Sequence, residues 1–137
     1  MKKKRLIFFI LIYFIFSFSN SYSQNYKKQN LTNQDSAQIK KYIENYEMYL
    51  AKSDLRNASD FLNQIATIYW NRNHFEQSIE YFLKSLKLNQ QLGNDNGIAG
   101  INSNLGMIYS DLGQFQKSVE HLEKTVAIRR TEKNTTI

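Results

Sequence analysis

Two histidines are the side chains best suited to acid–base or metal chemistry in this 137-residue chain, and both stand without suitable partners. His74 falls in a short polar break, and His121 lies on a helical stretch beside Glu120 and Glu123. A metal site or a proton relay needs a cysteine, a paired histidine or ligand-like spacing, which neither residue has. Both are therefore predicted to be ordinary surface histidines.

The carboxylates, glycines and cysteines give no catalytic site either. Asp35, Asp54 and Asp60 stand where helices are expected to start, so their carboxylates are expected to accept free backbone N–H groups. The five glycines are not followed by the Gly-Lys-Ser/Thr sequence of a phosphate loop. Because cysteine is absent, a disulfide, a thiolate metal site and a thiol nucleophile are excluded. We predict a protein that is not an enzyme and uses no cofactor or metal.

The net charge of +6 does not indicate nucleic-acid binding. Four of the basic residues fall within residues 2–5, and without them 14 basic residues remain against 12 acidic ones. The remaining lysines and arginines are interspersed with glutamates, whereas a nucleic-acid interface clusters them on one face. The sequence therefore predicts that no nucleic acid is bound.

Residues 1–23 have the three-part pattern of a secretory signal peptide. A basic start is followed by eleven apolar residues, 6–16, and then by a polar stretch that ends in Ser21-Tyr22-Ser23. The apolar run is shorter than the ~20 residues that a membrane span needs. We expect cleavage near Ser23–Gln24 and export to the periplasm or the medium, the alternative being an uncleaved membrane anchor.

The rest of the chain is predicted to be helical. Residues 24–34 are polar and aperiodic, so we expect a flexible arm there. From Asp35 onward, apolar residues recur at helical spacing, as in Ile39, Tyr42, Ile43 and Tyr46, with Asp35 or Ser36 available as the N-cap. The chain also lacks proline, which fits long uninterrupted helices. Residues 35–137 are thus predicted to form one all-α domain.

One stretch of sequence is nearly repeated forty residues later. Residues 64–78 read Q-I-A-T-I-Y-W-N-R-N-H-F-E-Q-S, and residues 104–118 read N-L-G-M-I-Y-S-D-L-G-Q-F-Q-K-S. The two copies share Ile, Tyr, Phe and Ser at matching positions, and a small residue, Ala66 or Gly106, at another. Small residues at fixed offsets allow neighbouring helices to approach closely. Self-similarity at this period predicts a solenoid of stacked helix pairs.

The two copies resemble tetratricopeptide repeats, which carry a Leu-Gly-x-x-Tyr pattern on helix A and Phe-x-x-Ala-x-x-x-Phe on helix B. The resemblance implies antiparallel helix pairs in a right-handed superhelix, with a half repeat at 35–52 and full units at 55–92 and 97–133. The period of forty exceeds the usual 34 residues. Three further departures are seen. Asn102 stands three residues before the Leu-Gly pair, where helix A usually has a large residue. Ser or Thr replaces alanine on helix B, and the proline that usually follows helix B is missing.

The resemblance also implies a concave groove that is lined by the A helices and binds another protein or a peptide. The matching positions are Asp60, Asn63, Gln64, Thr67, Trp70, Asn71, Ser103, Asn104, Met107, Ser110 and Asp111. They include no lysine or arginine, which the chaperone-binding members use to hold a terminal carboxylate. Trp70 is either a buried anchor for the ligand or a packing residue that serves stability, and the sequence leaves both open.

Two and a half repeats leave apolar residues on the last helix without a neighbour, because repeat arrays normally have three or more units and a polar cap. We hypothesise that the chain is the start of a longer array or pairs with a second copy through this helix. The leading prediction is an exported, non-catalytic protein-binding scaffold. The alternative is a truncated sensory region of a membrane-bound histidine kinase or a helix-turn-helix regulator.

Overall fold

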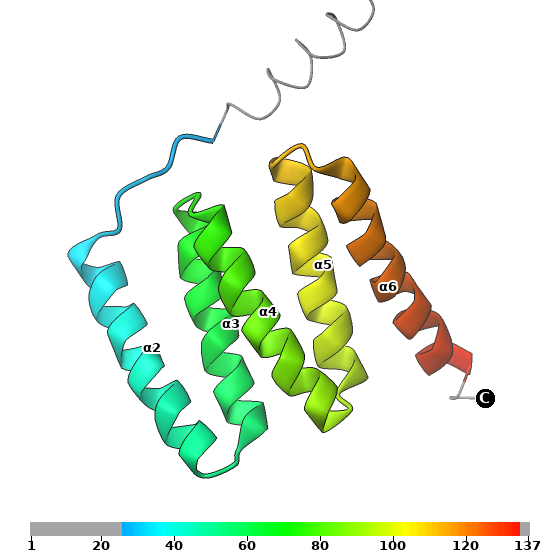
Figure 1. The fold of residues 1–137 in the computed structure, drawn as a ribbon, viewed down its shortest axis with the longest axis horizontal. Coiled ribbons are helices and arrows are strands. Elements are labelled where there is room, and N and C mark those ends of the chain that lie inside the picture. Colours follow the sequence, from blue (N-terminus) through cyan, green and yellow to red (C-terminus); the bar gives the residue numbers. More distant parts are fainter. Residues whose placement is uncertain (1–25, 135–137) are drawn as a thin grey trace, which may run out of the picture.

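The computed structural model describes residues 26–134, with side chains described as far as residue 131, and this part of the chain contains five helices and no strand. They are α2 (Asn33–Ala51), α3 (Leu55–Asn71), α4 (Phe75–Leu92), α5 (Asp95–Asp111) and α6 (Phe115–Asn134). The helices lie side by side in chain order and alternate in direction (Figure 1). The predicted all-α fold of antiparallel helices is confirmed. The predicted signal peptide lies outside the described residues, and none of the described helices is long and apolar enough to span a membrane.

The turns between helices recur every twenty residues. Each contains one residue with a left-handed backbone, at φ 56, 59, 60 and 69° for Ser53, Asn73, Gly93 and Gly113 respectively. The next residue then donates its N–H to the carbonyl five positions back, as from Asp54 to Tyr49 at 2.9 Å. A left-handed residue with this bond is a common way to end a helix. Because these turns are twenty residues apart, two helix–turn units make up the period of forty. The left-handed residue with its hydrogen bond also explains how the helices end without proline.

Side-chain caps start α2, α3 and α5, and two of the three predicted cap positions are corrected. Asp54 caps α3 as predicted, since its carboxylate accepts the Asn57 N–H at 3.1 Å. The cap of α2 is Thr32, and Asp35 instead accepts a bond from the Thr32 N–H at 2.8 Å in a capping box. Asp60 is exposed in the body of α3 and caps nothing. Helix α2 therefore starts two residues before the predicted boundary.

The small residues lie at close contacts between paired helices, as their positions predicted. Ala66 and Ser78 are fully buried between α3 and α4. In the second unit, a Cβ atom added to Gly106 of α5 would lie 2.8 Å from Cγ of Leu122 on α6. No larger side chain fits between these helices without displacing Leu122.

One hydroxyl in each unit, at a position where alanine is usual, joins the two helices of that unit. Ser85 on α4 donates to the Ser59 carbonyl of α3 at 3.1 Å. Thr125 on α6 donates to the Ala99 carbonyl of α5 at the same distance. Both pairs occupy the same positions in the repeat. The departures at Ser85 and Thr125 are thus one repeated interhelical hydrogen bond, whereas the buried Ser78 hydroxyl has no hydrogen-bond partner.

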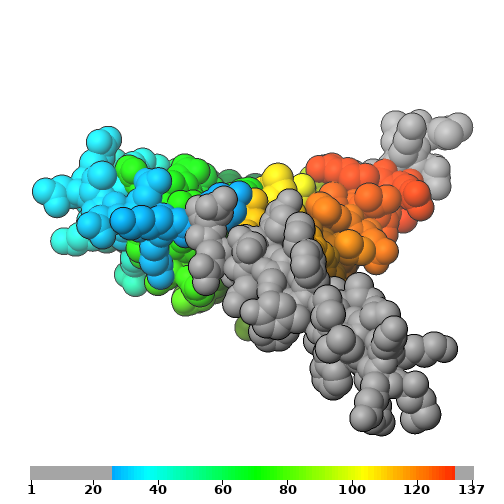
Figure 2. All heavy atoms as spheres, turned by 90° about the horizontal axis from the view of Figure 1, so that it is seen from above, coloured from blue at the N-terminus to red at the C-terminus, as the bar shows by residue number. Residues whose placement is uncertain are grey.

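The segment that precedes α2 lies against the turn between α3 and α4, across the helix ends seen from above in Figure 2. The Gln29 N–H donates to the Arg72 carbonyl at 3.0 Å, and the Arg72 side chain bonds Asp35 at 2.9 Å. The Tyr26 ring meets Phe75 edge-on at 5.5 Å between ring centroids. This differs from the predicted flexible arm over 24–34: residues 26–29 make specific contacts, and residues 33–34 belong to α2. The polar composition concealed these contacts because they are mostly hydrogen bonds.

Candidate peptide-binding face

The eleven predicted groove residues all lie wholly or partly at the surface of α3 and α5, which we call the A-helix face. Exposed members are Asp60, Gln64, Thr67, Asn71, Met107 and Ser110, and half-buried ones are Asn63, Trp70, Ser103, Asn104 and Asp111. Met107 is 44% exposed although Leu105 and Ile108 beside it are fully buried. One side of each A helix therefore packs inward while the other presents amides, hydroxyls and one thioether.

A hollow of about 290 Å³ opens where this face meets α2. Its lining consists of Asn63, Gln64, Thr67 and Ile68 from α3, and Gln38 and Tyr42 from α2. The structure thus brings three of the predicted residues together. It adds Gln38 and Tyr42 of α2, which the sequence interpretation missed because it confined the groove to A helices. It also adds Ile68 of α3. The signal that could have found Tyr42 is its place on α2, the helix preceding α3.

The exposed lining of the hollow is mostly apolar, and its polar side chains are only partly hydrogen-bonded. Gln38 Nε2 donates to the Tyr42 hydroxyl at 2.6 Å, and the Thr67 hydroxyl donates to the Asn63 carbonyl at 2.9 Å. The side-chain oxygen of Asn63 has no hydrogen-bond partner. A buried amide oxygen without a partner costs free energy. A rotation of the amide of Asn63 toward a bound peptide would supply the missing bond.

Trp70 connects the two A helices. Its ring meets the fully buried Phe82 edge-on at 6.3 Å and packs against the main core. Its indole N–H lies 3.4 Å from the Asp111 carboxylate of α5, which also takes a 3.4 Å bond from the Tyr26 hydroxyl. Two predicted residues that are far apart in sequence are thereby joined. Of the two roles left open, these contacts favour packing over ligand anchoring.

His121 differs from the predicted surface histidine, because it is half-buried against α5. Its Nδ1 lies 2.8 Å from Oδ1 of Asn102, and its ring stacks on Tyr109 at 5.4 Å. The Asn102 amide also donates to the Ile98 carbonyl at 2.9 Å. The first unit has Leu62 and Tyr81 at the corresponding positions. Asn102, which replaces the large residue usual at this repeat position, is therefore one member of a hydrogen-bonded pair with His121.

This burial predicts a dependence of stability on pH. Burial lowers the pKa of His121, Lys124 lowers it further, and Glu120 opposes the shift. The unfolded chain then binds the proton more readily, so stability is lost as the pH falls through about 6.5, the unfolded value. We expect the wild type to lose stability relative to His121→Tyr, which carries the residue of the first unit, between about pH 7.5 and about pH 5. Urea unfolding at both pH values measures this difference, and a constant difference would contradict it.

The face has the chemistry of recognition. Amides and hydroxyls donate and accept hydrogen bonds, as an extended peptide backbone requires. Among the side chains that the structure describes, residues 26–131, no three histidines or carboxylates gather as a possible metal site. Glu80 and Lys84 form an ion pair at 2.7 Å on the exposed side of α4.

Helix pairs that repeat every forty residues, with small residues at each contact and a polar A-helix face, define a helical-repeat protein. A family model described as tetratricopeptide repeat matches residues 54–131, more than half of the chain, and the chain belongs to this family. It is also similar to Response regulator aspartate phosphatase A of Bacillus subtilis (strain 168). The two are 31% identical over 91 residues, which are 66% of this chain and 24% of that protein. The chain thus matches only about a quarter of that relative's length.

Proposed function

We propose that the A-helix face binds an extended segment of another polypeptide, so that the chain is a non-catalytic scaffold. The hollow between α2 and α3 is the observation that carries this proposal. There Gln64 and Thr67 present an amide and a hydroxyl, and Asn63 lines the same hollow with a buried side-chain oxygen that has no hydrogen-bond partner. Membership of the tetratricopeptide repeat family supports binding of a protein in general terms.

The composition of the face limits what the bound segment is. The eleven residues include two aspartates and no lysine or arginine, so an acidic tail or a terminal carboxylate has no cation to pair with. Met107 supplies an adaptable apolar contact among polar neighbours. We therefore propose a neutral or basic segment that places an apolar side chain on Met107.

Site-specific photo-crosslinking tests the location of this site. A benzophenone amino acid at Gln64 or Met107 is expected to form a covalent adduct with a partner protein when cells or extracts are irradiated. The matched control positions are Glu76 and Glu80, which are exposed on the B helix α4. We expect little or no adduct from the controls. Equal adducts from all four positions would contradict binding at the A-helix face.

A second candidate is a role in signalling, as the sensory part of a larger regulator. The similarity to a response regulator aspartate phosphatase favours it. The sequence downstream of Ile137 tests this candidate: an in-frame or frameshifted continuation with further repeats and an output domain would support it.

Export from the cytoplasm is also proposed, on the basic, apolar and small-residue pattern of residues 1–23. The mass of the protein purified from its natural source checks this proposal. A chain that begins near Gln24 would support it, and an intact Met1 would contradict cleavage.

A further inference from the structure

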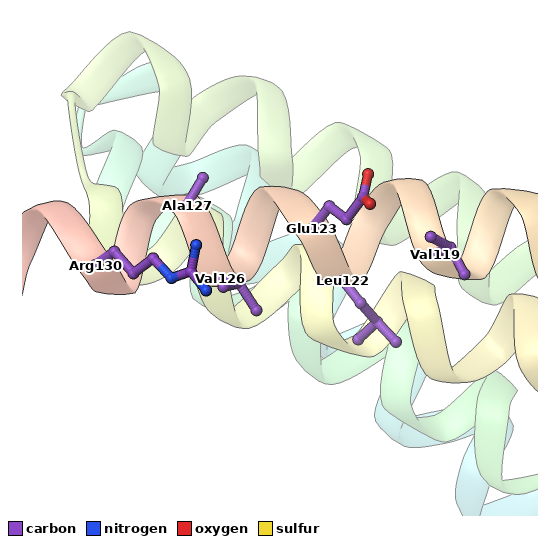
Figure 3. A pocket seen from close by; sticks show the side chains of 6 residues that line it. All are labelled: Val119, Leu122, Glu123, Val126, Ala127 and Arg130. Carbon is purple, nitrogen blue, oxygen red and sulfur yellow. The ribbon is translucent and has the colours of Figure 1, made fainter.

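The outer side of α6 is apolar and lacks the neighbour that covers the corresponding side of α4. Phe82 of α4 is fully buried, whereas Leu122, forty residues later, is 40% exposed. Val119 and Val126 are 48% and 47% exposed, while their counterparts Ile79 and Leu86 pack against the core. Val119, Leu122 and Val126 line a surface hollow of about 420 Å³ on α6 (Figure 3). Adjacent exposed apolar side chains of this kind indicate a contact surface.

Two opposite charges flank this apolar surface at a fixed interval. Glu123 and Arg130 line the same hollow as Leu122 and Val126. They are seven residues apart, which is about two helical turns and returns to the same side of the helix. Neither has an ion pair or a side-chain hydrogen bond in the described part of the chain. Both charges are thus available to a second molecule.

The arrangement is complementary to itself. When two α6 helices pack antiparallel about a two-fold axis between Val126 and Ala127, Glu123 of each copy faces Arg130 of the other. A symmetric dimer contains every such contact twice, so both charge pairs form together. Flanking charges of this kind set the partner and the orientation of packed helices. We propose that this side of α6 is the interface of an antiparallel homodimer.

Helix α4, which α5 packs against, has Leu83 and Gln90 at the positions of Glu123 and Arg130, and both remain exposed there. A following A helix would therefore leave Glu123 and Arg130 in solvent, whereas a second α6 helix would pair both charges. This inference does not depend on the A-helix face.

Charge reversal in the full 137-residue chain tests the proposal by analytical ultracentrifugation. The wild type is expected to form dimers. Glu123→Arg or Arg130→Glu places like charges opposite each other twice, so each is expected to raise the dimer dissociation constant about tenfold or more. The double reversal is expected to restore wild-type association. Both residues are on the surface of α6, and circular dichroism verifies that each variant is folded.

Mixing the two single variants gives the sharpest result. The introduced arginine of one variant then faces the introduced glutamate of the other, and the unchanged Arg130 and Glu123 still face each other. A heterodimer is therefore expected, although each variant alone dissociates. A wild type that stays monomeric at all concentrations would overturn the proposal and leave this face to a different protein. Association that neither reversal weakens would also overturn it, because it would arise elsewhere in the chain.

Discussion

Replacement of Phe82 by alanine is expected to lower the free energy of unfolding by about 3–5 kcal/mol. The ring is fully buried in α4, meets the Trp70 ring edge-on, and belongs to the core cluster that α5 completes with Ile101 and Leu105. Its removal leaves a cavity between two repeat units, which the surrounding helices cannot fill without separating from each other. Denaturant unfolding followed by circular dichroism measures the loss.

Leu122→Ala is the matched control, since Leu122 holds the same repeat position on α6 but is 40% exposed. We expect a loss of about 1 kcal/mol, because only part of that side chain leaves an apolar environment. Both variants are compared at a concentration low enough for the chains to be monomeric. Equal losses at the two positions would contradict the packing described for α4 and α6.

Gly97→Ala is expected to destabilise the protein by about 1–3 kcal/mol, although alanine normally favours a helix. A Cβ atom at this position would collide with the side-chain amides of Asn89 and Asn94. Those two amides are bonded to each other at 2.6 Å, and Asn94 caps α5 by accepting the Gly97 N–H at 3.3 Å. Because the Asn89 side chain of α4 is buried and bonded to the Ser85 carbonyl, it has little room to move aside.

Gly100→Ala, one turn further along α5, is the control. An added Cβ there meets nothing within 4 Å. We expect this change to stabilise the protein by about 0.5–1 kcal/mol, because the unfolded chain loses backbone freedom. The two thermal unfolding midpoints should therefore move in opposite directions. A loss of stability from both changes would show that the Asn89–Asn94 contact is not the cause.

The fold was predictable from the sequence because stacked repeats need the same contacts twice. Tyr69 and Tyr109, or Ala66 and Gly106, identify paired helices as soon as the offset of forty is recognised. The A-helix face followed from the same register. Its eleven residues lie at the surface because the inward positions of α3 and α5 are taken by residues such as Ile65 and Leu105.

Contacts outside the repeat could not be predicted, because no second copy records them. The Arg72 side chain bonds Asp35 of α2 and its carbonyl accepts the Gln29 N–H, whereas the second unit has Leu112 at that position. The Asn102–His121 pair occupies positions where the first unit is apolar or aromatic, so it appeared as a departure from the pattern. The turns that contain Ser53 and Asn73 were predicted, but their left-handed backbone was not, since only Gly93 and Gly113 carry the residue usual there.

The affinity of a partner captured by crosslinking tests most directly whether the A-helix face is the binding site. Met107→Ala removes an exposed side chain from this face, and Met48→Ala removes one of similar exposure, 40% against 44%, from α2. Neither change opens a cavity, so both proteins should stay folded. Calorimetric titration is predicted to show an affinity weakened about tenfold by Met107→Ala and unchanged by Met48→Ala. Equal affinities for all three proteins, or a loss from Met48→Ala alone, would contradict binding at this face.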